Sequence, residues 1–168
     1  MKLQRTLTSK TVESDPYSLA ETIALIALGP RAKSRGELFA HLKKRGIPED
    51  IANAVLFRLQ EQGLVNDEEF ARAWSESRQR AKKLSKRVIA SELQSKGVSS
   101  DVIEIVIAEI DEEGEYENAL EFATRKLRSV SRFETEVIYR RVHSALMRKG
   151  YSSSLINRVL RELDISPR

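Results

Sequence analysis

The stretch that decides the fold is LKKRGI at residues 42–47, because it returns as LQSKGV at residues 93–98 and as LMRKGY at residues 146–151. The glycines of the three copies lie 51 and then 53 residues apart. Each glycine has a leucine four positions before it, a basic residue directly before it and an apolar residue directly after it. A constant period of this length indicates a protein built from repeated units.

The agreement between the copies continues on both sides of the glycine. Apolar residues recur eight positions before it and five, nine and thirteen positions after it: Leu38, Ile89 and Val142; Ile51, Val102 and Leu155; Val55, Val106 and Val159; Leu59, Ile110 and Leu163. Steps of four positions mark one face of an α-helix. A glycine just past a helix end adopts a left-handed conformation without a Cβ clash, and a basic residue before it suits the negative end of the helix dipole. Each copy therefore predicts a helix, a glycine turn and a second helix.

A further helix is predicted before each pair. The first runs from Pro16 to Leu28 and is stopped by Gly29-Pro30, the second starts after Asn66, and the third covers Glu115 to Leu127. We therefore predict an all-α fold of three tandem three-helix repeats at residues 16–61, 62–113 and 114–165. Units of about 50 residues have small cores and are stabilised by packing against their neighbours. This packing favours an elongated, slightly curved array. Residues 1–15 are polar and aperiodic, so we expect a disordered N-terminal tail.

The composition excludes several classes of site. The chain has no cysteine, which rules out disulfides, thiolate zinc sites and a cysteine nucleophile. Its two histidines, His41 and His143, are far apart and have no metal-ligand spacing around them, and the acidic stretch Asp111–Glu117 lacks the ligand pattern of a calcium loop. No glycine-rich phosphate loop or nucleophile elbow occurs. We expect a protein without catalytic residues, metal or cofactor, and no run is apolar enough to span a membrane.

The charges are segregated along the chain. The net charge is only +4, yet residues 101–121 contain nine acidic residues and no Lys or Arg. From Arg125 to the end there are eleven basic residues against four acidic ones, and six of the ten residues from Arg78 to Arg87 are basic. Segregation of this kind indicates a surface that binds a polyanion.

The basic stretch from Arg78 to Arg87 is the main candidate for that surface, because it is expected to join two helices at the middle of the array. Similar basic turns in the outer units are expected to lie on the same line and to follow a phosphate backbone. Apart from Gln79, the stretch offers only point charges and no aromatic residue to stack bases, while Trp74 and Tyr151 fall at core positions. We therefore predict binding to DNA without sequence specificity, weakening as salt increases.

Several motifs resemble those of RecX regulatory proteins. The central ones are GLVNDEEFA at residues 63–71, Trp74, and IASEL at residues 89–93 followed by Lys96-Gly97. The outer ones are SRGEL at residues 34–38 and RKGY at residues 148–151, so that the resemblance covers roughly residues 19–163.

The resemblance implies a cytoplasmic bacterial protein, suited to act as a monomer, that lies along the groove of the RecA–DNA filament. Such a protein restrains filament growth or ATP hydrolysis by RecA and tempers strand exchange and the SOS response. Carried over by position, the candidate DNA- or filament-binding residues are Arg78, Arg80, Lys82, Lys83, Lys86 and Arg87, followed by Arg140, Arg141, Arg31 and Arg35.

Two other functions stay open at this point. Three-helix units also build helix-turn-helix transcription factors, but the predicted third helices (Glu49–Gln60, Asp101–Ile110 and Ser153–Glu162) are mostly apolar and the middle one is acidic. A helical-repeat scaffold that binds only protein is the second alternative. Such a scaffold would not need the charges of Arg78–Arg87.

Overall fold

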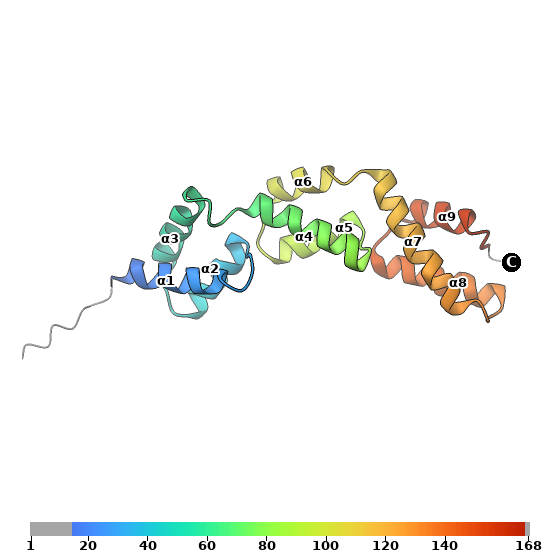
Figure 1. Cartoon of the computed structure of the whole chain (residues 1–168), viewed down its shortest axis with the longest axis horizontal. Coiled ribbons are helices and arrows are strands. Elements are labelled where there is room, and N and C mark those ends of the chain that lie inside the picture. The colour runs from blue at the N-terminus through green and yellow to red at the C-terminus, as the bar shows by residue number, and fades with distance from the viewer. Residues whose placement is uncertain (1–14, 167–168) are drawn as a thin grey trace, which may run out of the picture.

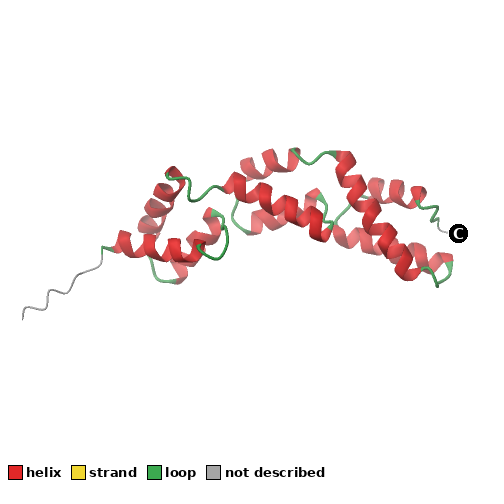
Figure 2. Ribbon diagram, viewed as in Figure 1, coloured by secondary structure: helices red, strands yellow, loops and turns green. Residues whose placement is uncertain are grey.

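The computed structural model describes residues 15–166, so the predicted N-terminal tail lies outside the described residues except for Asp15. Within that range the chain forms helices and no strands (Figure 2). The helices are α1 (Pro16–Leu28), α2 (Arg35–Lys44), α3 (Glu49–Glu61), α4 (Asp67–Lys82), α5 (Lys86–Ser95), α6 (Ser100–Ala108), α7 (Glu112–Val130), α8 (Thr135–Lys149) and α9 (Ser153–Glu162). The predicted all-α fold is confirmed.

The helices form three consecutive units, α1–α3, α4–α6 and α7–α9, each around its own apolar core. Figure 1 shows the units in tandem along one curved, elongated array. The second helices α2, α5 and α8 lie toward one long edge, and the third helices α3, α6 and α9 lie toward the other (Figure 1). The repeated positions found in the sequence supply the cores: Leu38, Ile89 and Val142 are fully buried at equivalent places. The array is as predicted, while the limits of the repeats at residues 16–61, 62–113 and 114–165 stay predictions.

Local signals set the helix ends. The α1 helix has the predicted bounds, and its N-cap Asp15 accepts a hydrogen bond from the backbone N–H of Tyr17. The α7 helix starts earlier than predicted, at Glu112, because Asp111 caps it by accepting from the backbone N–H of Gly114. The turn glycines Gly46, Gly97 and Gly150 have φ values of +82°, +74° and +88°, the left-handed conformation that the motif predicted.

Neighbouring units are joined by the same kind of contact. At the first junction the N-cap residue of α2, Ser34, donates through Oγ to the carbonyl of Lys96 at 2.5 Å. At the second junction the N-cap residue of α5, Ser85, donates its backbone N–H to the carbonyl of Lys149 at 3.1 Å. Both serines are buried. The start of each second helix therefore docks on the basic-Gly turn of the following unit.

The two ends of the array differ from the junctions. A Cβ placed on Gly46, in the turn of the first unit, would meet no atom within 4 Å. The α8 helix of the last unit begins 15 residues before its glycine, whereas α2 and α5 begin 11 residues before theirs. The residue equivalent to Ser34 and Ser85, 12 positions before the glycine, is Ile138. It lies inside α8 and is therefore not an N-cap residue.

None of the helices within residues 15–166 has the length and apolar character needed to cross a membrane.

Candidate nucleic-acid interface

The basic turns of the first two units are joints between units, whereas the sequence predicted three basic turns that lie on one line and follow a phosphate backbone. The turn between α1 and α2 (residues 29–34) and the turn between α4 and α5 (residues 83–85) both contact the next unit. Among residues 15–166, the turn between α7 and α8 (residues 131–134) has no further unit beside it (Figure 1). Arg140 and Arg141, predicted to lie in the third basic turn, are inside α8. The residues proposed for DNA contact therefore divide into those used inside the molecule and those exposed on it.

Arg78 and Lys83 belong to the first group. The guanidinium of Arg78 lies 3.7 Å from the ring centroid of Trp74, and its Nε donates to the carboxylate of Glu92 at 2.7 Å. Lys83 is only 12% exposed, and its Nζ contacts the Glu121 carboxylate of the third unit at 2.6 Å. Lys83 also donates to the Asn118 side chain at 2.8 Å. Lys83 therefore joins the second unit to the third, whereas Arg78 holds α4 to α5 within the second unit.

Arg31 and Arg35 are likewise engaged within the molecule. Arg31 forms an ion pair with Glu37 at 3.0 Å. Arg35 donates to the side chain of Asn53 at 2.7 Å and to that of Gln60 at 3.1 Å, so it clamps α2 to α3. Its backbone N–H donates to Asp67 of the second unit at 2.7 Å. Arg35 is therefore held inside the molecule, whereas the Arg31 side chain is 51% exposed and only its surface ion pair competes with a phosphate.

The remaining candidates face solvent. Arg80, Lys82, Arg87 and Arg140 are exposed, and none of them forms an ion pair within residues 15–166. Arg141 is also exposed, and its guanidinium lies 4.0 Å from the ring centroid of Phe133. Lys86 is partly exposed, while its backbone N–H donates to Glu115 at 2.9 Å. Exposed cations without carboxylate partners are the ones suited to phosphate oxygens.

The structure adds cations that the sequence reasoning did not select. We call them, with Lys82, the junction cations: Lys82, Arg125, Lys126, Arg148 and Lys149. The Nζ of Lys149 donates to the carbonyl of Lys82 at 2.7 Å. Burial, together with the charges of Lys82 and Arg125, lowers the pKa of Lys149, so these cations from α4, α7 and α8 lie close enough to repel one another. In the sequence, these residues were part of the basic excess after Arg125. Their position beside the end of α4 follows only from the fold.

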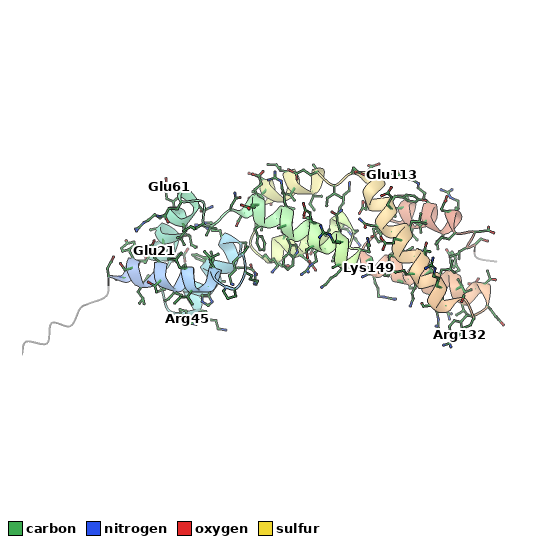
Figure 3. The ribbon with its side chains drawn as sticks, in the orientation of Figure 1. Glu21, Arg45, Glu61, Glu113, Arg132 and Lys149 are labelled. Carbon is green, nitrogen blue, oxygen red and sulfur yellow. The ribbon has the colours of Figure 1, made fainter. Side chains whose placement is uncertain are left out.

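Some basic and acidic residues lie toward opposite long edges of the array. In Figure 3, Arg45, Lys149 and Arg132 are labelled toward the edge of the second helices, whereas Glu61 and Glu113 are labelled toward the edge of the third helices. Some of these acids are paired locally, as Glu109 is with Arg72 at 2.8 Å and Glu113 with Arg158 at 3.1 Å. The edge of the third helices also carries exposed Arg58, Arg158 and Arg161, so both signs of charge occur there.

The described residues contain no cluster of three or more His, Asp or Glu side chains placed to hold a metal ion. His143 is partly buried and stacks on Tyr139, with ring centroids 5.7 Å apart, as expected for a structural histidine. Trp74 packs against the second core and donates through Nε1 to Glu92 at 2.8 Å. Tyr151 is buried and donates to the Lys83 carbonyl at 2.8 Å. The predicted structural roles of Trp74 and Tyr151 are confirmed.

Comparisons with known families match all three units in order. Residues 20–59 match the first three-helix domain of RecX, residues 66–107 the second and residues 113–160 the third. The proteins named Regulatory protein RecX from Streptomyces coelicolor and Mycobacterium avium are both 40% identical to this chain. The first match covers 88% of this chain and 79% of the relative, and the second covers 86% and 84%.

Solved structures agree with the fold. The crystal structure of RecX from Lactobacillus salivarius superposes with a TM-score of 0.81 and 22% identity, covering 90% of this chain and 99% of that one. A second crystal structure, titled regulatory protein RecX, gives a TM-score of 0.77 with 21% identity over 88% of this chain. At these identities the likeness establishes the three-unit architecture.

Proposed function

Because this chain belongs to the RecX family of regulatory proteins, we propose that it binds the RecA–DNA filament and mainly inhibits the recombinase and ATPase activities of RecA. The observation that carries the proposal is the match of all three family domains, in order, over residues 20–160. In this role the protein acts in DNA repair and recombination and tempers the SOS response. It works in the cytoplasm as a monomer and performs no chemical reaction itself.

The shape and the charges support this role. An elongated array can contact several repeating sites of a filament at once, whereas a sphere of the same mass reaches fewer. The exposed cations Arg80, Lys82 and Arg87, together with the junction cations, offer phosphate contacts that carry no base information. Such contacts provide affinity for any DNA sequence and leave the choice of partner to RecA.

The third helix of the middle unit, α6, argues against the alternative of an operator-binding transcription factor, whereas α9 exposes Asn157, Arg158 and Arg161. A recognition helix presents side chains such as Arg, Asn or Gln to base edges. The α6 helix instead exposes Asp101, Glu104 and Ile105, which would repel or fail to recognise DNA. A footprint at one defined DNA sequence would favour that alternative.

The proposed mechanism is a shift of a conformational equilibrium. A protein that bridges neighbouring RecA protomers stabilises the filament geometry to which it binds best. If ATP hydrolysis requires the protomers to pass through other geometries, that preference slows the cycle. Inhibition then needs no contact with the nucleotide of RecA.

The test is a titration of RecA's DNA-dependent ATPase with the full chain, together with filament lengths from electron microscopy. We expect hydrolysis to fall as the chain is added and filaments to shorten or stop growing. A control without RecA checks that the chain alone hydrolyses no ATP. Unchanged hydrolysis and filament length at saturating dose would refute the proposal.

A further inference from the structure

A shallow hollow lies where the second and third units meet. It is lined by Leu84, Phe122, Lys126, Ala145, Arg148 and Lys149. Leu84 comes from the turn between α4 and α5, Phe122 and Lys126 lie one turn apart on α7, and the other three lie near the end of α8. The hollow therefore exists only because two units are joined.

The hollow is lined by both apolar and positively charged side chains. Leu84, Phe122 and Ala145 supply apolar surface, and the other three lining residues are cations with no carboxylate among them. The Nζ of Lys149 lies 4.8 Å from the ring centroid of Phe122 and is held by the carbonyl of Lys82. Lys82 and Arg125 add positive charge close to Lys149. A partly exposed aromatic ring surrounded by cations is the combination that binds single-stranded nucleic acids.

The walls of the hollow are fixed by the junction. Lys83, next to Leu84, is tied to Glu121 and Asn118 of α7 at 2.6 and 2.8 Å. Tyr151 closes the same joint by donating to the carbonyl of Lys83. Phe122 follows Glu121 directly, so these contacts set the position of the ring relative to Leu84. The apolar floor of the hollow is therefore preformed, and binding needs to order only the cationic side chains around it.

We propose that this hollow binds one unpaired nucleotide of a single DNA strand. Its base displaces the Lys149 ammonium from over the Phe122 ring and lies against that ring and Leu84, and its flanking phosphates lie at Lys126, Arg148 and the displaced Lys149. The inference rests on the proposed function and deepens it, because it names the form of DNA that the cationic edge recognises. A base within a duplex is stacked between its neighbours and cannot reach the ring. Since every base has a π-face, the site accepts any sequence.

Fluorescence anisotropy tests the proposal with three labelled probes: a thymidine oligonucleotide, an abasic strand of the same length, and a duplex. Phe122→Leu keeps an apolar side chain in the hollow but removes the ring. Phe39→Leu is the matched control, since Phe39 is another partly buried phenylalanine, packed on the core of the first unit. We expect Phe122→Leu to weaken thymidine binding by at least about fivefold, the low end of the effect of removing one base stack. Binding of the abasic strand and the duplex stays the same, and Phe39→Leu leaves all three unchanged.

A photocrosslinking measurement covers the case in which Phe122→Leu fails to fold. A strand carrying 5-iodouracil, irradiated on the unaltered chain, is expected to attach to the peptide that contains Phe122. Attachment elsewhere only, or equally weakened binding of all three probes by a folded Phe122→Leu variant, would overturn the hollow as a nucleotide site. So would unchanged thymidine binding by that variant.

The outcome for RecA is separate from the outcome for the hollow. If the chain inhibits RecA while Phe122→Leu binds thymidine normally, only the hollow is refuted. If thymidine binding depends on Phe122 but RecA activity never changes, the proposed function fails and the hollow stands.

Discussion

Gly150 has a φ of +88°, and a Cβ on it would lie 2.3 Å from Val88 Cγ2 and 2.6 Å from Ser85 Oγ. Gly46 has nearly the same φ, +82°, but a Cβ there would meet nothing within 4 Å. The two glycines thus share a backbone requirement, while only one of them also provides space for the neighbouring unit.

This difference predicts unequal effects of the same substitution. Gly46→Ala should cost about 1–2 kcal/mol, the penalty of a left-handed alanine. Gly150→Ala should cost clearly more, because the added methyl group also separates α5 from the turn of the third unit. Urea denaturation of the two variants measures both costs. Equal reductions in stability would mean that Val88 and Ser85 do not pack closely against Gly150.

Two adjacent lysines should also behave differently. Lys82 is exposed, so Lys82→Ala should weaken DNA binding and reduce the salt slope by about 0.7–0.9, the value for one neutralised phosphate, with little change in stability. Lys83 is tied into the junction, so Lys83→Ala should cost on the order of 1–2 kcal/mol of stability instead. Thermal denaturation and DNA titrations at several salt concentrations separate the two effects. The reverse pattern would show that the roles are exchanged.

The sequence could not distinguish these two lysines. Both residues belong to the same basic stretch of the sequence. In the structure, Lys83 follows the last residue of α4 and takes a left-handed conformation with a φ of 49°. Its partners Glu121 and Asn118 lie in another unit, and no local pattern predicts so distant a contact. Phe122 was not singled out either, because no local pattern shows that it lies beside Leu84 of another unit.

At the scale of elements, helices were predictable because their signals are local. Pro16 and the Gly29-Pro30 pair bracket α1, and the glycine turns end α2, α5 and α8. The docking of one helix start on the next unit's turn was not predictable, because it depends on which faces meet. The basic turns were therefore read as solvent-exposed, although two of them are joints.

The joint between α2 and the second unit contains a titratable contact. Glu37 accepts hydrogen bonds from Arg31 and from Lys96, at 3.0 and 2.8 Å. Burial alone would raise the pKa of Glu37, but these two hydrogen bonds outweigh it and hold the pKa at about 2, below the ordinary value of 4.5. Lys96 also lies 4.0 Å from the ring centroid of Trp74, the only tryptophan of the chain.

The sign of the pH effect follows from the lowered pKa. The stabilisation by the Glu37 carboxylate is complete above pH 4.5 and disappears as the pH falls toward about 2. Trp74 fluorescence should therefore change over this range as Lys96 is released. Glu37→Gln should reduce that change and lower stability at neutral pH, whereas Glu49→Gln, at an exposed ion pair with Lys43, should leave it in place. A Glu37→Gln variant with an unaltered fluorescence transition would contradict this account of the joint.

At the scale of the whole molecule, the 51- and 53-residue spacing was enough to predict three units in tandem. A repeat that buries its apolar face only against neighbours gives an elongated shape, as Figure 1 shows. The sequence alone did not predict on which side of the array the cations would lie. The cations of α7 and α8 join the end of α4 across the second junction, and they are better candidates for DNA contact than the internally paired Arg78, Lys83 and Arg35.

The most direct test of the central claim is the RecA ATPase titration repeated with two charge-reversal variants. Arg80→Glu/Lys82→Glu changes two exposed cations at the end of α4, and Arg58→Glu/Arg161→Glu makes the same change of charge on the third helices α3 and α9. We predict that the first variant needs at least about tenfold more protein for half-maximal inhibition, because opposite charges now face the phosphates. The second variant should inhibit like the unaltered chain. Equal inhibition by both variants would contradict the claim that this cationic edge binds the filament.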